Sequence, residues 1–232
     1  MIHQLIFAHP KPGMSEEEFQ RYWLEVHAPN YASKIKQIRK YAVDTRIPLD
    51  GDGEDPLWSG IAEIWLNNDE EQLASLQSPE FLQGARLDEP NWAAFWRTLV
   101  LDTEAHVLRP GPGTARPAGA KLFVLAKRAA GTPLADFRAR SLDAHAKLAL
   151  EVPGLVRYVQ GFTRDGAYAI GEATLDVAYQ LSFESEEALR TALASPEYAA
   201  LEQDLAEFVE TRYIHRMAVR QHWFIGSESA ND

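Results

Sequence analysis

The chain has 232 residues, of which 46% are hydrophobic and 25% charged, as in an ordinary soluble globular protein. Its net charge of -11 argues against binding to the phosphate backbone of nucleic acids and to anionic membrane surfaces. The sequence has no cysteine, which excludes disulfides, thiolate catalysis and cysteine-held metal clusters. The first ten residues contain no basic leader and no long apolar stretch, so we expect a cytoplasmic protein without a signal peptide or membrane-spanning segment.

The first half of the chain predicts the order strand, helix, strand, strand, helix, strand. The predicted strands are rich in apolar residues and cover Ile2–Ala8, Tyr41–Thr45, Gly60–Leu66 and Leu99–Leu108. Ser15 and Glu18 form a capping-box pattern, which starts a helix that should run to about His27. Asp69 opens the second helix, and Ser78 before a proline is typical of a fresh N-cap.

The second half repeats this order. Its predicted strands are Leu122–Ala126, Val156–Phe162, Val177–Phe183 and Met217–Phe224. Thr132 is the expected N-cap of the first helix, with Pro133 at the first helical position, and Ser185 and Ser195 start the later helices. Residues 110–120, rich in proline and glycine, have the composition of a linker.

The two halves are copies of one unit. Ser78-Pro79-Glu80-Phe81 corresponds to Ser195-Pro196-Glu197-Tyr198, at an offset of 117 residues, and the offset nearer the start is 118. We therefore expect domains over residues 1–109 and 121–225, joined by the linker and followed by a tail at 226–232. The β-α-β-β-α-β order is that of a ferredoxin-like unit. The predicted fold class is α+β: tandem ferredoxin-like units forming an intramolecular dimeric α+β barrel, the fused counterpart of a twofold homodimer.

One motif in the first copy is more specific. It reads Gly13-Met14-Ser15, then Phe19, Tyr22-Trp23 and His27-Ala28-Pro29, with Tyr41 further on. This pattern resembles the signature of the EthD family, and the second copy resembles it in weaker form through Gly131, Phe137 and His145. The resemblance implies membership of the dimeric α+β barrel superfamily. That superfamily includes lactone isomerases, polyketide cyclases, haem-dependent aldoxime dehydratases and cofactor-free oxygenases of phenols.

His27 and Tyr41 are the candidate catalytic residues. In the lactone isomerases a histidine and a tyrosine at similar positions are thought to line the pocket, and the resemblance implies the same roles here. His27 lies near the C-terminal end of a predicted helix, where the partial negative charge favours a protonated imidazole that can shuttle protons. The structural alternative is that His27 caps its helix and Tyr41 packs over it. Both interpretations stay open, because His145 and Tyr158 repeat the pair.

Differences between the copies favour a pocket in the first half. Tyr22-Trp23 is replaced by Arg140-Ser141 in the second copy, and Trp58, Trp65, Trp92 and Trp96 have no tryptophan counterparts. These rings either enclose a flat ligand or simply form core. The candidate substrate-binding residues are Phe7, His9, Tyr22, Trp23, Glu63 and Trp65.

Two of these candidates have specific expected roles. Glu63, on the third predicted strand, would orient His27 or act as a base. For His9, aligned with Lys127, a solvated strand end is the favoured interpretation, and binding of a substrate carboxylate or phenolate is the functional alternative.

The leading hypothesis is a cofactor-independent acid–base enzyme of the lyase or isomerase type. It would decarboxylate, dehydrate, isomerise or cyclise a small aromatic, polyketide or lactone-like substrate, with His27 moving the proton and Tyr41 stabilising an oxyanion. The alternatives are a cofactor-free oxygenase of phenols, a haem enzyme with His27 or His145 as axial ligand, and a non-catalytic carrier or sensor in a catabolic pathway. No metal-binding motif is present, the expected partner is a small molecule, and a further homodimer is left open.

Overall fold

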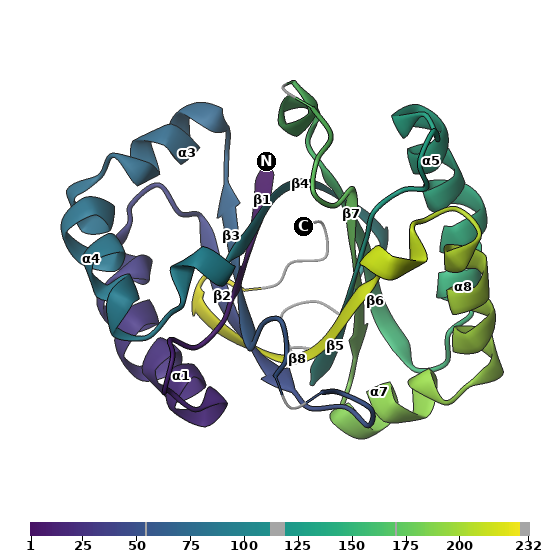
Figure 1. Ribbon diagram of the computed structural model, residues 1–232, viewed down its shortest axis with the longest axis horizontal. Coiled ribbons are helices and arrows are strands. Elements are labelled where there is room, and N and C mark those ends of the chain that lie inside the picture. Colours follow the sequence, from purple (N-terminus) through teal and green to yellow (C-terminus); the bar gives the residue numbers. More distant parts are fainter. Residues whose placement is uncertain (54, 112–118, 170, 228–232) are drawn as a thin grey trace. The chain divides into compact units, whose positions relative to one another are not determined.

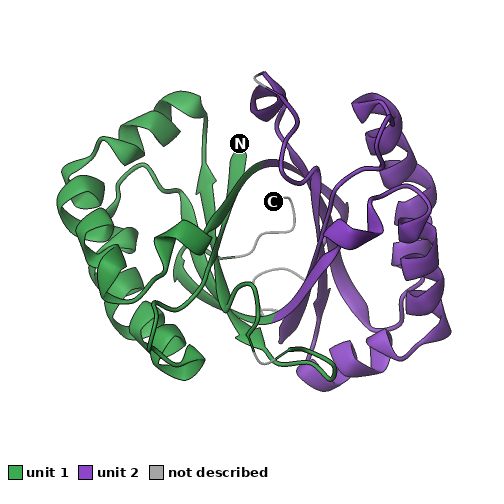
Figure 2. Ribbon diagram, in the orientation of Figure 1, with its two compact units in different colours: residues 1–102, 219–227 green, residues 103–218, 228–232 purple. Residues whose placement is uncertain are grey.

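The computed structural model describes residues 1–53, 55–111, 119–169 and 171–227. They fall into two compact units, shown in Figure 2. Unit 1 contains residues 1–102 and 219–227, and unit 2 contains residues 103–218. The units differ from the ranges of the repeat because the last strand of each copy is divided between them. Most of the predicted linker (112–118) and of the predicted tail (228–232) lies outside the described residues.

Unit 1 is built on three consecutive antiparallel strands with helices over one face (Figure 1). Its strands are β1 (Ile2–Ala8), β2 (Lys40–Ile47) and β3 (Gly60–Leu66), with parts of β4 (Leu99–Arg109) and β8 (His215–Ile225). Its helices are α1 (Glu16–Tyr22), α2 (Ala28–Asn30), α3 (Asp69–Leu76) and α4 (Arg86–Asp88), with short 3₁₀ turns at Ala32–Lys34, Glu89–Asn91 and Phe95–Arg97. The predicted capping box is confirmed, since the Ser15 hydroxyl accepts from Glu18 N–H and the Glu18 carboxylate accepts from Ser15 N–H.

Unit 2 repeats the plan. Its strands are β5 (Ala120–Ala126), β6 (Leu155–Thr163) and β7 (Val177–Phe183), with the second part of β4 paired to β6. Its helices are α5 (Leu134–Arg140), α6 (Ala146–Leu150), α7 (Glu186–Leu193) and α8 (Pro196–Ala206), with 3₁₀ turns at Asp165–Tyr168 and Thr211–Tyr213. Thr132 was the wrong N-cap: Pro133 occupies that position, and α5 begins at Leu134.

The α+β fold class is confirmed. The strands are hydrogen-bonded in the order β1-β3-β2-β8-β5-β7-β6-β4, a closed barrel in which each copy contributes a ferredoxin-like set of elements. Strand registers agree between the copies, since Ile6 lies opposite Ala62 and Val124 lies opposite Tyr179. No helix within the described residues is long and apolar enough to cross a membrane.

π-helical turns interrupt the helices. One follows α1 at Trp23–His27 and its counterpart follows α5 at Ser141–His145. A third, at Phe81–Ala85, has no counterpart within α8, which is regular. The offset between the copies falls from 117 to 116 across this third turn. The isolated bridges show this: Pro10 pairs with Ala93 in the first copy and the equivalent Arg128 pairs with Val209 in the second, so Ala93 corresponds to Val209. The first copy therefore carries one extra residue here, and a π turn accommodates it.

Candidate functional site

Unit 1 holds a cavity of about 120 Å³ on the helix-covered face of its sheet. From β1 its wall takes Gln4, Ile6 and Ala8, and most of the other lining groups are apolar. Leu76 and Phe95 line the cavity and are themselves partly exposed at the protein surface. The volume is close to that of an engineered cavity of about 150 Å³ that binds benzene, so a single-ring ligand is the appropriate size.

His27 lines this cavity and is oriented by Asp88. The π turn at Trp23–His27 carries the imidazole, whose Nδ1 lies 2.8 Å from Asp88 Oδ2. The other carboxylate oxygen of Asp88 accepts from the Tyr22 hydroxyl at 2.7 Å and from the Asn91 amide at 3.0 Å. With Nδ1 engaged, Nε2 is the ring nitrogen left for a ligand in the cavity.

Burial and Asp88 have opposite effects on the pKa of His27. Burial lowers the pKa of His27 below its ordinary value of 6.5, and the hydrogen bond and charge of Asp88 offset only part of this. The helix-end effect expected from the sequence is outweighed, and His27 is neutral at pH 7. Burial raises the pKa of Asp88, but the hydrogen bonds from Asn91, His27 and Tyr22 outweigh it, so this pKa lies below its ordinary value. Burial and Asp88 together raise the pKa of Tyr22 to about 12.

Aromatic rings complete the wall beside His27. Trp92 lies 4.6 Å from the His27 ring and 4.8 Å from the Trp23 ring, measured between centroids. Trp23 donates from Nε1 to the Tyr41 hydroxyl at 3.2 Å, so the Tyr41 O–H remains able to donate to a ligand. Burial raises the pKa of Tyr41, which keeps the hydroxyl protonated. Gly60 makes room for Trp23, because a Cβ there would lie 2.9 Å from its ring.

The same histidine–aspartate pair exists in unit 2, beside a space that is nearly filled. His145 Nδ1 lies 2.8 Å from Asp204 Oδ2, and Arg140 takes the place of Tyr22 by donating to the other oxygen at 3.0 Å. The space lined by His145 and Tyr158 measures only about 10 Å³, roughly the volume of one water probe. Tyr179 accounts for much of the difference, since it occupies the strand position of Ala62 and lines this space.

The hydroxyl groups of Tyr158 and Tyr179, which line this space, have hydrogen-bond partners within the protein. Tyr158 accepts from the Gln160 amide at 3.0 Å, and Ser141 lies 2.9 Å from the Tyr179 hydroxyl. Ser141 stands where unit 1 has Trp23, and Val177 stands where unit 1 has Gly60. The second copy therefore has a packed polar site at the position where the first copy has an aromatic cavity.

Three predicted substrate-binding residues lie on the opposite face of the unit 1 sheet, because side chains alternate along a strand. Phe7 packs against Trp58 at 5.1 Å, and Trp65 stacks between His3 at 4.3 Å and Trp223 at 5.4 Å. Glu63 accepts from His3 at 2.9 Å and from the Gln221 amide at 2.5 Å. The expectation that Glu63 orients His27 was wrong, and Asp88 has that role.

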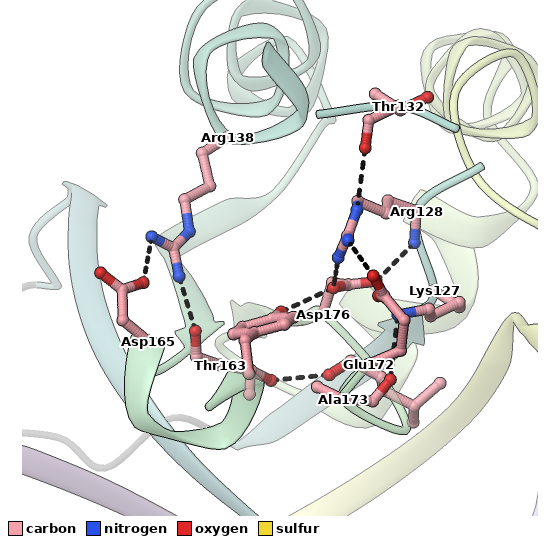
Figure 3. Close-up of polar contacts among 11 residues, drawn as sticks. Lys127, Arg128, Thr132, Arg138, Thr163, Asp165, Glu172, Ala173 and Asp176 are labelled. Carbon is pink, nitrogen blue, oxygen red and sulfur yellow. Dashed lines mark hydrogen bonds and ion pairs between the residues drawn. The ribbon is translucent and has the colours of Figure 1, made fainter. Parts of the chain in front are cut away.

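His9 also lies outside the cavity. It borders a separate hollow at the end of β1, where its Nε2 is 2.7 Å from Arg97. Burial and the Arg97 charge lower its pKa. The aligned residue in unit 2, Lys127, is locked in an ion-pair network: Figure 3 shows Lys127 and Arg128 directed at Glu172 and Asp176. A strand-end cation is thus internally paired in the second copy.

Asp88 and Trp92 were missed from the sequence as site residues. The sequence did contain a signal for Asp88. Beyond the third π turn the two copies align at an offset of 116 residues, and at this offset Asp204 repeats Asp88. Trp92 was noted only within the tryptophan cluster, and its counterpart is Phe208.

A haem does not fit either histidine. The spaces beside His27 and His145 are about 120 and 10 Å³, whereas pockets for drug-sized ligands have about 300–1,000 Å³. Within the described ranges, no three His, Asp or Glu side chains are grouped as metal ligands would be.

Comparisons with known proteins agree with this fold. The EthD domain matches residues 11–95 and 129–212, and no curated protein matches the chain. An anthrone oxidase-like protein is similar in structure, with a TM-score of 0.67 and 14% identity over 100% of this chain and 93% of its own. A putative monooxygenase from Lactobacillus acidophilus NCFM is similar with a TM-score of 0.57 and 12% identity, over 99% of this chain and 97% of its own. A putative monooxygenase from Fusobacterium nucleatum is similar with a TM-score of 0.60 and 6% identity, over 99% of this chain and 94% of its own. These likenesses show the fold, and the two domain matches show that the chain belongs to the EthD family, with two tandem copies of its domain.

Proposed function

We propose that unit 1 is a cofactor-independent acid–base enzyme of the lyase or isomerase type, acting on a small apolar substrate with a single ring. One observation carries this proposal: the His27–Asp88 pair borders a ring-sized cavity, whereas the equivalent His145–Asp204 pair borders a space of about 10 Å³. The pair alone would also suit a structural role, and the cavity is what favours catalysis.

In this mechanism neutral His27 removes a proton from the substrate at Nε2. Asp88 then stabilises the imidazolium through its hydrogen bond to Nδ1, which lies 2.8 Å away. Tyr41 donates its hydroxyl proton in a hydrogen bond to the oxygen on which negative charge develops. The imidazolium finally returns the proton to a different substrate atom or to a leaving group.

This proton relay is sufficient for isomerisation, cyclisation or dehydration of a neutral substrate. In each of these reactions electrons stay within the substrate and its products, so no oxidant or reductant is required. The apolar wall favours a ring over a charged or strongly solvated ligand, because an unpaired charge is costly to bury.

The test begins with a panel of single-ring aldehydes, ketones, phenols and lactones, screened by thermal shift. Each compound that binds is incubated with the protein in D₂O, and proton exchange and product formation are followed by NMR. We expect His27→Gln to slow exchange by about 100-fold or more, the lower range for a positioned proton-transfer group. Glutamine can keep a hydrogen bond to Asp88, so folding should survive.

His145→Gln is the matched control, because it removes the same pair from unit 2. We expect it to retain the wild-type exchange rate. A His27→Gln variant that exchanges as fast as the wild type would overturn the proposal.

Two other outcomes identify the alternatives. Oxygen uptake in step with substrate loss would favour a cofactor-free oxygenase, an activity suggested by the names of the anthrone oxidase-like and monooxygenase neighbours. Tight binding without any exchange or product would favour a carrier or sensor.

A further inference from the structure

Trp92 has a buried indole N–H for which the described residues offer no acceptor. Its side chain is only 3% exposed, and the residue lines the cavity beside His27. A buried donor without an acceptor is unfavourable in a folded protein, and such groups are rare. A ligand in the cavity is the natural source of the missing acceptor.

The other indole in this wall is already satisfied. Trp23 donates to Tyr41, so Trp92 is the tryptophan of the cavity that retains an unused donor. The ring of Trp92 also lies next to that of His27, at 4.6 Å between centroids. An acceptor held by Trp92 would therefore lie close to the proposed base.

The second copy separates the packing role of this position from its polar role. Phe208 stands in place of Trp92, 5.3 Å from His145 and 5.6 Å from Phe137. Trp92 makes the corresponding ring contacts to His27 and Phe19. A phenyl ring is thus enough to pack the site, and the N–H is what the first copy adds.

We propose that Trp92 is a specificity-determining residue whose Nε1–H donates a hydrogen bond to a neutral carbonyl oxygen on a single-ring substrate. This inference rests on the proposed function in that it names the substrate class of the same site. A carboxylate is the wrong acceptor, because the wall is largely apolar and the anionic Asp88 lies directly behind His27. The carbonyl is also where charge develops when a proton is removed from the adjacent carbon.

The test compares benzaldehyde with styrene, which has nearly the same shape but carries C=CH₂ in place of C=O, and with benzoate. Dissociation constants are measured by NMR titration. We expect the wild type to bind benzaldehyde about tenfold more tightly than styrene, the ratio for one satisfied buried donor, and benzoate most weakly. In Trp92→Phe this preference should fall by about fivefold or more, with styrene affinity retained, because Tyr41 is the donor that remains.

Trp223→Phe is the control. Trp223 also has a buried indole N–H without a partner among the described residues, but it stacks on Trp65 away from the cavity. This variant should keep the wild-type preference. The proposal is overturned if Trp92→Phe keeps the preference, if benzoate binds best, or if the wild type binds benzaldehyde and styrene equally or binds neither.

A second measurement needs no stable variant at position 92. In ¹⁵N-labelled wild-type protein, benzaldehyde should slow the hydrogen exchange of one indole N–H in the cavity, and styrene should not. The indole of Trp223 should be unaffected by either compound. Because these readouts measure binding, they also apply to His27→Gln: a preserved preference in a protein without turnover would refute the proposed catalysis while leaving the role of Trp92 intact.

Discussion

His27 shows how a buried side chain obtains a protonation state suited to accepting a proton. Burial disfavours the charged form and lowers the pKa of His27 below 6.5, and the hydrogen bond and charge of Asp88 offset part of this effect. A stronger carboxylate effect would leave the imidazole already protonated at pH 7. Without the carboxylate, the imidazolium formed in the proposed proton transfer would be unstabilised.

Replacing Asp88 should therefore move the pH profile in a defined direction. In the proposed mechanism the neutral imidazole is the active form, so kcat/KM should rise with pH through the pKa of His27 and reach a plateau above it. In Asp88→Asn the charge that raises this pKa is lost, so the rise should shift to lower pH. The plateau should fall by at least about tenfold, because proton transfer by a positioned group contributes about 10²–10⁴-fold.

The pH dependence of kcat/KM in the two aspartate variants checks this prediction. Asp204→Asn removes the corresponding charge beside His145 and should leave the profile unchanged. A rise that stays in place or moves to higher pH in Asp88→Asn would show that Asp88 does not set the pKa of the active base.

Residue patterns in the sequence predicted His27 and Tyr41 as candidates, and both line the cavity of unit 1, but these patterns did not indicate the partner of His27. The motif joins residues close together in the chain, whereas Asp88 lies 61 residues beyond His27. Glu63 was the candidate partner, as a carboxylate on the third predicted strand. Strand alternation directs the neighbours Ala62 and Ile64 to the cavity and Glu63 to the other face.

Strand elements were predictable to within a few residues, and β3 and β7 have the expected bounds. The reason is that each strand is a compact run of β-branched and apolar residues between turn signals. The π turns were not foreseen, because the apolar spacing that signals a helix is compatible with one local extra residue. The turn at Phe81–Ala85 was detectable only as a change of offset between the copies.

At the level of the strands, we predict that Ala62 keeps the cavity open. Ala62→Leu adds apolar volume at the position that Tyr179 fills in unit 2, so it should abolish benzaldehyde binding at little cost in the free energy of unfolding. Leucine is preferable to tyrosine at position 62. In unit 2 the Tyr179 hydroxyl lies beside the small Ser141, whereas unit 1 has the much larger Trp23 at the position of Ser141. NMR titration and urea unfolding measure the two quantities.

The reverse change in unit 2 is the control for volume. Tyr179→Ala should lower the free energy of unfolding by about 3–5 kcal/mol, as expected when a large buried ring is truncated. It should leave benzaldehyde binding in unit 1 unchanged. Wild-type affinity in Ala62→Leu would mean that ligands do not enter this cavity.

At the scale of the whole molecule, the site of unit 1 depends on the compact unit, whose boundaries differ from those of the sequence repeat. Residues 219–227 follow the second copy in sequence but belong to unit 1. There the His222 ring lies 3.1 Å from the Thr45 hydroxyl, and Phe224 packs against Tyr41 at 5.7 Å. A wall residue of the site is therefore supported by the far end of the chain.

We accordingly predict that residues 1–109, expressed alone, are not a stable monomer. Without 219–227 the sheet of unit 1 lacks its last strand, so the fragment should be largely unfolded when dilute and should gain structure only when two copies associate. Circular dichroism and size-exclusion chromatography over a concentration series would measure this. A folded monomer with the melting temperature of the full chain would contradict the prediction.

The unequal filling of the two units has an energetic consequence. An unfilled space of about 120 Å³ destabilises a protein by about 3 kcal/mol at roughly 24 cal/mol per Å³. In a homodimer symmetry would impose that penalty on both subunits, because every change in the gene appears twice. In the tandem chain the penalty falls on one unit, while the other can evolve toward dense packing. Gene duplication and fusion thus relax the conflict between activity and stability that a symmetric assembly cannot avoid.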